Sequence, residues 1–253
     1  MLLSLLMSDA DMTTKLMYVV FELIVIMVSL SFHEWAHAYA AHRMGDDTAL
    51  NMGRMTLNPV AHIDPLGILA LLFIGFGWAK PVPVNPRNYR EYRKGEFIVS
   101  FAGIFMNLML ALFAALLAVA VAVYDSASKG IPIRTEVIMG LSLYRISLGN
   151  LPESIYMFLY MLGITNCALA VFNFIPVYPL DGAHIFELVF GKTLGARAVM
   201  WLRNNGRIIL YVFIGLSFLL SNMGISFSLI GGVSSWLLER FVSLFAMIVG
   251  LFV

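Results

Sequence analysis

One apolar run, from Leu16 to Arg43, limits the folds open to this chain more than any other feature. About 20 mainly apolar residues are enough for a helix to cross the hydrocarbon core of a bilayer, and this run is longer. The whole chain agrees with it, because 60% of its 253 residues are hydrophobic and only 12% are charged. A soluble domain carries about 25% charged residues. We therefore expect an all-α protein that crosses the membrane several times.

Further apolar runs predict four more membrane helices, at Phe97–Tyr124, Ser154–Ile175, Arg207–Ser221 and Trp236–Val253. The expected number of spans is thus about five to six, depending on Pro65–Ala79. As a helix, that segment measures about 22 Å against a core of about 30 Å, so it favours a short re-entrant segment over a sixth span. The proline-rich stretch after it predicts extended backbone, and Glu187–Gly206 is expected to be a basic connection.

Composition also bears on domain number and partners. We find no internal repeat or low-complexity segment, so residues 1–253 are expected to form a single membrane-embedded domain. The net charge is +1 and basic runs with interleaved aromatics are lacking, which argues against nucleic-acid binding. Cys167 is the single cysteine, which excludes a disulfide within the chain and a cysteine metal cluster. It is expected to pack as an apolar residue.

The first apolar run contains the pentapeptide His33-Glu34-Trp35-Ala36-His37. Residues four apart lie on one face of a helix, so the two imidazoles can bind one metal ion while Glu34 serves as the base. Ionisable groups in a membrane helix are costly, and a bound cation would compensate for their cost. The pattern predicts a zinc hydrolase. Catalytic zinc commonly has three protein ligands, so a third is needed from elsewhere.

Asp181 is the best candidate for that third ligand. It follows a predicted span, comes after Pro179, and precedes Gly182, which tolerates close packing. Taken alone, Asp181 would be interpreted as a helix N-cap. Together with the histidine pair, it is interpreted as a ligand.

Other polar residues near the spans have simpler interpretations. His62 and Asp64 could bind metal, but capping and turn formation are favoured. His184 could be a fourth ligand, although a polar neighbour of the site is favoured. Glu22 could line a polar path, while a position at the membrane interface is favoured.

The two motifs together resemble the site-2 protease family of intramembrane zinc metalloproteases. The resemblance rests on the histidine motif, on the spacing Gly103…Asn107, on the segment Gly77–Pro86, and on Asn173-Phe-Ile-Pro-Val-Tyr-Pro-Leu-Asp181-Gly182. It points to the compact bacterial branch without PDZ or CBS domains. Two positions depart from the family pattern: Ile104 replaces a proline, and Ala183-His184 replaces Gly-Arg or Ser-Arg.

The resemblance implies one Zn²⁺ held by His33, His37 and Asp181, with Glu34 as the catalytic residue that moves the proton during peptide hydrolysis. It implies substrates that span the membrane or are anchored to it, and a multi-pass protein of the bacterial inner membrane.

Four further residues are predicted to contact the substrate. Asn173 and Asn107 are candidate contacts to the substrate backbone or oxyanion, although helix packing is an equal alternative for Asn173. The extended segment predicts strand contacts at Val82 and Val84. A metal transporter and an inactive scaffold are the alternative functions, and the oligomeric state stays open.

Overall fold

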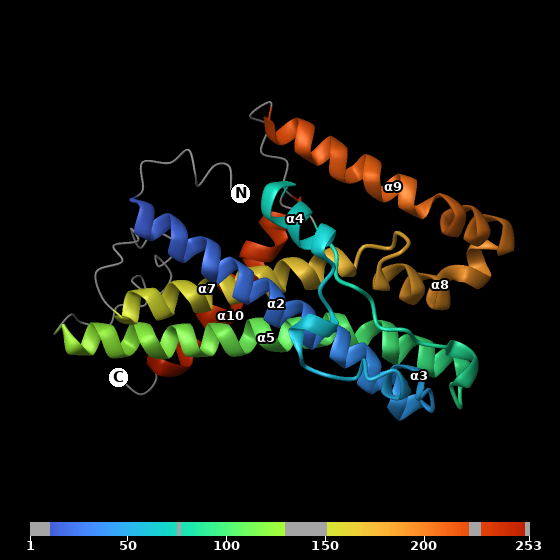
Figure 1. Ribbon diagram of the computed structural model, residues 1–253, viewed down its shortest axis with the longest axis horizontal. Helices are drawn as coiled ribbons and strands as arrows, with labels where there is room; N and C mark the ends of the chain where they lie inside the picture. The colour runs from blue at the N-terminus through green and yellow to red at the C-terminus, as the bar shows by residue number, and fades with distance from the viewer. Residues whose placement is uncertain (1–10, 75–76, 130–150, 223–228, 251–253) are drawn as a thin grey trace.

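The computed structural model describes residues 11–74, 77–129, 151–222 and 229–250, and every regular element within them is helical (Figure 1). The all-α prediction is therefore confirmed. The long helices are α2 (Met12–Met44), α5 (Tyr92–Ser128), α7 (Leu151–Asn173), α9 (Ala196–Asn222) and α10 (Leu229–Gly250). The shorter elements are α3 (Thr48–Asn51), η1 (Pro59–Ala61), α4 (Pro65–Ile74), η2 (Pro86–Asn88) and α8 (Asp181–Leu194).

Four of the described helices have segments long and apolar enough to cross a bilayer: α2, α5, α7 and residues Ile230–Val249 of α10. The predicted five to six spans are therefore too many for the described part of the chain. The difference lies in α9, whose first half carries Arg197, Arg203 and Arg207. Its remaining apolar part is about 22 Å long, short of the hydrocarbon core of about 30 Å. The multi-pass architecture itself holds.

The predicted basic connection Glu187–Gly206 is wrong, because this stretch is helical on both sides of Gly195. Helix α8 ends at Leu194, Gly195 has a φ of 80°, and α9 begins at Ala196. Glycine reaches a positive φ without the steric cost that a Cβ would bring. One residue is thus enough to separate the two helices, and the basic side chains lie on helices instead of a loop.

Helix α4 has ten residues and measures about 15 Å, too short to cross a membrane. This agrees with a re-entrant or surface-dipping segment, and its depth in the bilayer stays a prediction. The stretch from Lys80 to Asn85 has no regular secondary structure. It returns the chain to α2, where the backbone N–H of Val82 meets the side chain of Glu34.

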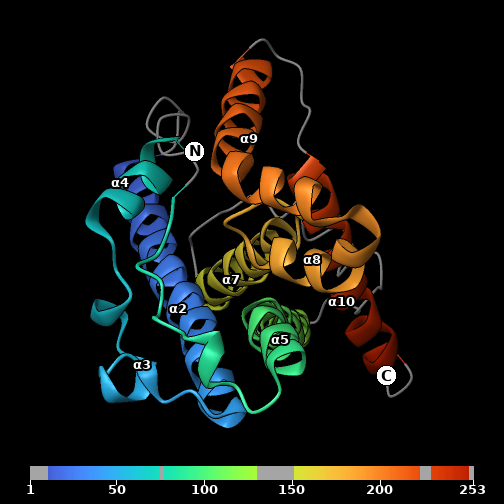
Figure 2. The same cartoon turned by 90° about the vertical axis from the view of Figure 1, so that its right-hand side faces the viewer.

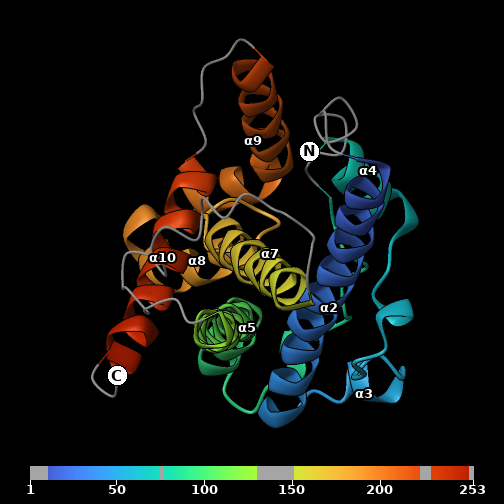
Figure 3. The same ribbon diagram turned by 90° about the vertical axis from the view of Figure 1, so that its left-hand side faces the viewer.

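The centre of the bundle is the pair α5 and α7, which lies between α2 and α10 (Figures 2 and 3). Ala114 of α5 packs with Val25 of α2 and Met161 of α7. On the other side, Cys167 of α7 packs with Leu238 of α10. Small side chains on α5 allow the helix backbones to approach closely. Cys167 is fully buried and unpaired, as predicted.

Two local features bring distant parts of the chain to the middle of this bundle. Helix α2 ends at Met44 and is capped by Gly45, whose φ of 108° lets its N–H donate to the carbonyls of Ala41 and His42. Helix α8 packs beside α5 (Figure 2). A Cβ at Gly182 would lie 2.2 Å from the carbonyl oxygen of Phe174, so only glycine permits this approach. The first residue of α8 is thereby fixed near α2.

Candidate metal centre

His33 and His37 lie on successive turns of α2, and both are buried. Their Nε2 atoms are 3.0 Å apart and their rings meet edge to face. This follows from the spacing of four residues, which places both side chains on one face of the helix. Two imidazole nitrogens thus point at the same small volume inside the protein.

Asp181 supplies the third atom of this cluster from the first position of α8. Its Oδ2 lies 3.5 Å from Nε2 of His33 and 3.3 Å from Nε2 of His37. The predicted convergence of the three ligands is thus present, although 144 positions separate His37 from Asp181 in the numbering (181 − 37 = 144). No other group of this kind occurs among the residues that the structure describes.

The three atoms fit a zinc ion. Ligand atoms at about 2.0–2.1 Å from a tetrahedral centre are about 3.3 Å from one another. The three observed separations lie between 3.0 and 3.5 Å. The Oδ2 atom of Asp181 is buried and makes no hydrogen bond with the described residues, so it is a polar atom that a cation would satisfy. Two imidazoles and one carboxylate also match the ligand types of catalytic zinc sites.

Helix α5 orients both imidazoles through their Nδ1 atoms, the ring nitrogens that do not face Asp181. Nδ1 of His33 contacts Oδ1 of Asn107 at 3.0 Å, and Nδ1 of His37 contacts the carbonyl oxygen of Val99 at 2.7 Å. Both partners are acceptors, so each Nδ1 carries the proton, which leaves each Nε2 free to bind a metal ion.

Gly103 explains how α5 approaches so closely. A Cβ at this position would lie 2.4 Å from Nε2 of His37 and 2.5 Å from Cε1 of His33. Any side chain here would therefore displace the two rings. The glycine four residues before Asn107 leaves room for the imidazoles, while Asn107 itself orients one of them.

Glu34 lies beside the histidines and is 7% exposed. Its Oε2 accepts a hydrogen bond of 2.7 Å from the backbone N–H of Val82. One carboxylate oxygen is thereby fixed by the chain that returns from α4. A buried carboxylate next to a metal site is the arrangement that a general base requires.

The sequence profile of Peptidase family M50 matches residues 21–220. This range contains all three ligand residues and Glu34. The chain belongs to Peptidase family M50. The resemblance to the site-2 proteases is therefore confirmed.

Two curated relatives of this M50 chain carry the name "Putative zinc metalloprotease". YwhC of Bacillus subtilis (strain 168) is 38% identical over 164 residues, which cover 65% of this chain and 66% of the relative. Rip2 of Mycolicibacterium smegmatis is 34% identical over 110 residues, which cover 40% of this chain and 42% of the relative. The chain thus spans just under two thirds of the first relative and less of the second. No solved structure matches it.

Other residues singled out in the sequence lie elsewhere. His184 bonds to Glu96 of α5 at 2.8 Å, and it is not part of the ligand cluster. Asp64 caps α4 through the backbone N–H groups of Leu66 and Gly67, as the capping interpretation predicts. His62 is buried against the carbonyl of Thr56.

The predicted substrate contacts have distinct environments. Asn173 donates its amide to the carbonyl of Leu169 within α7, and its roles in substrate contact and in helix packing both stay predictions. The side chain of Val82 is buried against Ala38 and Ala49, so it faces the protein interior. Val84 is 36% exposed, and its backbone makes no hydrogen bond with the described residues.

Glu22 is buried on α2 at 8% exposure, so its carboxyl does not extend into open solvent. Its predicted position at the membrane interface stays a prediction. Its burial follows from the helix face it shares with Val25 and Ser29, which α7 covers.

Sequence reasoning missed three groups around the site. The carbonyl of Val99 carries no side-chain signal, although its position four residues before Gly103 places it on the same face of α5. Asp46 and Arg54 hold the segment that carries Val82, and their partners are distant in sequence. Only a tertiary structure could reveal these contacts.

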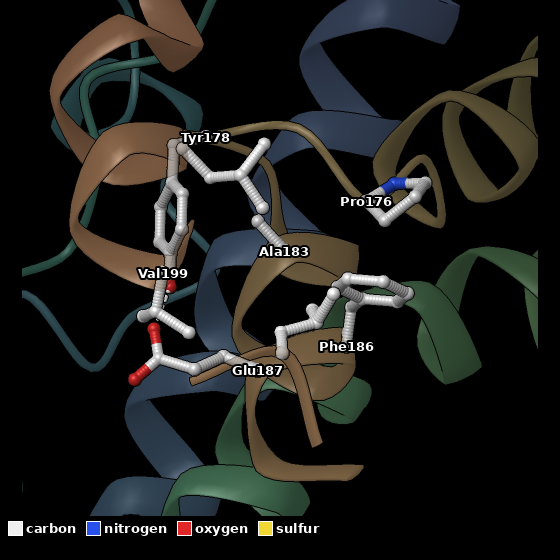
Figure 4. A pocket seen from close by; sticks show the side chains of 8 residues that line it. Pro176, Tyr178, Ala183, Phe186, Glu187 and Val199 are labelled. Carbon is white, nitrogen blue, oxygen red and sulfur yellow. Dashed lines mark hydrogen bonds between the residues drawn. The ribbon is translucent and has the colours of Figure 1, made fainter. Parts of the chain in front are cut away.

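A separate pocket lies between the turn that follows α7 and helices α8 and α9 (Figure 4). Tyr178 and Glu187 lie on its wall, and the Tyr178 hydroxyl donates to the Glu187 carboxylate. Arg203 makes a two-pronged contact with the same carboxylate, at 2.6 and 2.8 Å. The lining includes none of the three ligand residues. Its polar contacts tie α8 to α9.

Proposed function

We propose that this chain is an intramembrane zinc endopeptidase that cleaves membrane-spanning or membrane-anchored substrates. The single observation that carries the proposal is the convergence of His33, His37 and Asp181 on one point. The two histidines and Glu34 lie on α2, which is apolar enough to cross a membrane. When bound, zinc would polarise the scissile carbonyl and lower the pKa of the attacking water.

The roles of the protein groups follow from their positions. Glu34 would accept the proton of the attacking water and then deliver it to the leaving amine. Asn107 and the Val99 carbonyl would hold the imidazoles in the orientation that binds metal. The Nδ2 atom of Asn107 is buried and has no partner among the described residues. We assign it as a donor to the substrate backbone or the oxyanion.

The peptide bond of a helical substrate is protected by its own hydrogen bonds, so the substrate must unwind locally before attack. An extended peptide could then add to the edge of the Lys80–Asn85 segment. Pro81 and Pro83 lack N–H groups, and the N–H of Val82 is already donated to Glu34. Val84 is therefore the residue of this edge whose backbone can bind a substrate strand. The four membrane-length helices support a multi-pass location, which we place in the bacterial inner membrane.

The experiment that tests the proposal compares the wild-type protein with Glu34→Gln. A transmembrane peptide is reconstituted with each purified protein, and fragments are identified by mass spectrometry. We expect fragments with the wild type alone and about one zinc per chain in both proteins, because Gln keeps an acceptor for the Val82 N–H.

Two outcomes would contradict the proposal. Equal cleavage by Glu34→Gln would exclude Glu34 as the base. Zinc without cleavage in either protein, over a panel of such peptides, would favour a scaffold or a transporter.

A further inference from the structure

The hydrogen bond from Val82 to Glu34 comes from a segment without regular secondary structure. Within Pro81–Pro83, Val82 is the one residue with a backbone N–H, because prolines flank it on both sides. Its side chain is buried against Ala38 and Ala49. A segment without regular secondary structure holds a donor in place only if both of its ends are fixed. Here a charged side chain, Asp46 or Arg54, makes hydrogen bonds to each end.

Asp46 anchors the later end of the segment. It is fully buried directly after Gly45, at the end of α2. Its carboxylate accepts the backbone N–H of Asn85 at 2.6 Å and the side-chain amide of Asn88 at 2.8 Å, and both the N–H and the hydroxyl of Thr48 also donate to it. Burial raises the pKa of Asp46, but these hydrogen bonds outweigh it and keep the pKa below its usual value. The anchor is thus a charged acceptor.

Arg54 anchors the earlier end. Its Nη2 donates to the carbonyl oxygens of Lys80 at 2.8 Å and Pro81 at 3.2 Å. The N–H of Lys80 donates in turn to the carbonyl of His62, which is itself buried. Val82 therefore directly follows Pro81, the last residue that Arg54 contacts, and lies three residues before Asn85, whose N–H donates to Asp46.

We propose that Asp46 and Arg54 form a two-ended clamp that positions the Val82 N–H on the carboxylate of Glu34. Neither residue contacts Glu34, so both act as positioning residues. A glutamate side chain has several rotatable bonds, and catalysis requires its carboxylate within about 0.5 Å of the productive geometry. The clamp holds one carboxylate oxygen and leaves the other to move the proton. This inference rests on the proposed peptidase function.

The test measures kcat, KM and zinc content for Asp46→Ala, Arg54→Ala and Val82→Pro with a transmembrane peptide. A hydrogen bond to a charged group contributes about 1.5–3 kcal/mol, so kcat is expected to fall about ten- to hundredfold in each variant. KM should change less than twofold and zinc should stay near one per chain. Arg54→Lys should lose less kcat than Arg54→Ala, because the lysine side chain keeps a positively charged hydrogen-bond donor. Asp47→Ala is the matched control, since Asp47 neighbours Asp46 and its side chain is exposed.

The double variant Asp46→Ala/Val82→Pro separates positioning from folding. If the clamp acts through the Val82 N–H, removing Asp46 should lower kcat by less than threefold once that N–H is gone. The inference is overturned if the fold-loss of kcat in the double variant equals the product of the losses in the two single variants, or if Asp46→Ala loses zinc. Either result would assign Asp46 a purely structural role. A wild-type protein that cleaves no peptide would instead count against the peptidase function itself.

Discussion

Asn107 and His33 are joined by a contact of 3.0 Å between Oδ1 and Nδ1, although one lies on α5 and the other on α2. Through this contact α5, which carries none of the three candidate ligands, orients the imidazole of His33. The metal centre is therefore a property of the packed helix pair and not of the histidine motif alone.

Asn107→Leu should weaken zinc binding about 10- to 100-fold, because it removes the acceptor that orients His33. Zinc affinity can be measured by competition with a chelator of known strength. Asn166→Leu is the matched control, since Asn166 is equally buried but bonds to Ser29 and to Leu162 on its own helix. Equal loss of zinc in both variants would show that Asn107 acts only through stability.

The histidine pair, Glu34 and Asp181 were all foreseeable from the sequence, because their spacing and their neighbouring prolines and glycine are local patterns. The contact of Asn107 with His33 was not, because the two residues are 74 positions apart. Val82 shows the same limit: its strand pattern was visible, while the use of its N–H by Glu34 depends on tertiary packing. The span predicted at Arg207–Ser221 failed because these residues belong to α9, whose first half carries arginines and whose apolar part is too short to cross the bilayer.

Gly103→Ala should remove most zinc and lower cleavage at least tenfold. The added Cβ would lie 2.4 Å from Nε2 of His37, so the ring must move away from the metal position. Zinc content and cleavage rate measured on the purified variant give the result. In Gly215→Ala nothing lies within 4 Å of the added Cβ, so this control should behave as wild type. Full zinc content in Gly103→Ala would disprove the close packing of α5 on α2.

Val84→Pro should raise KM for a transmembrane peptide about tenfold, because it removes the backbone N–H that we assign to substrate binding. Zinc content should not change. Val84→Ala keeps the N–H and should keep KM within twofold of wild type. The strand-edge proposal fails if the proline and alanine variants have the same KM.

Glu187→Gln should lower the melting temperature by about 2–4 °C at pH 7, corresponding to about 1 kcal/mol. Burial raises the pKa of Glu187, but the hydrogen bonds from Arg203 and Tyr178 dominate and lower it below 4.5. A lowered native pKa stabilises the protein above pH 4.5, and this stabilisation is lost as the pH falls through the native value.

The difference between wild type and Glu187→Gln should therefore shrink at pH 4 and below. Thermal unfolding at pH 7 and pH 4 checks this, with the exposed Glu239→Gln as a control. A difference that grows in acid would contradict the assigned ion pair.

The most direct measurement of the central claim is the zinc content per chain of purified wild type, Glu34→Gln and Asp181→Ala. If His33, His37 and Asp181 bind one ion, the first two proteins should contain about one zinc per chain and Asp181→Ala should contain far less. A wild-type protein without stoichiometric zinc, or an Asp181→Ala variant that keeps it at wild-type affinity, would contradict the account.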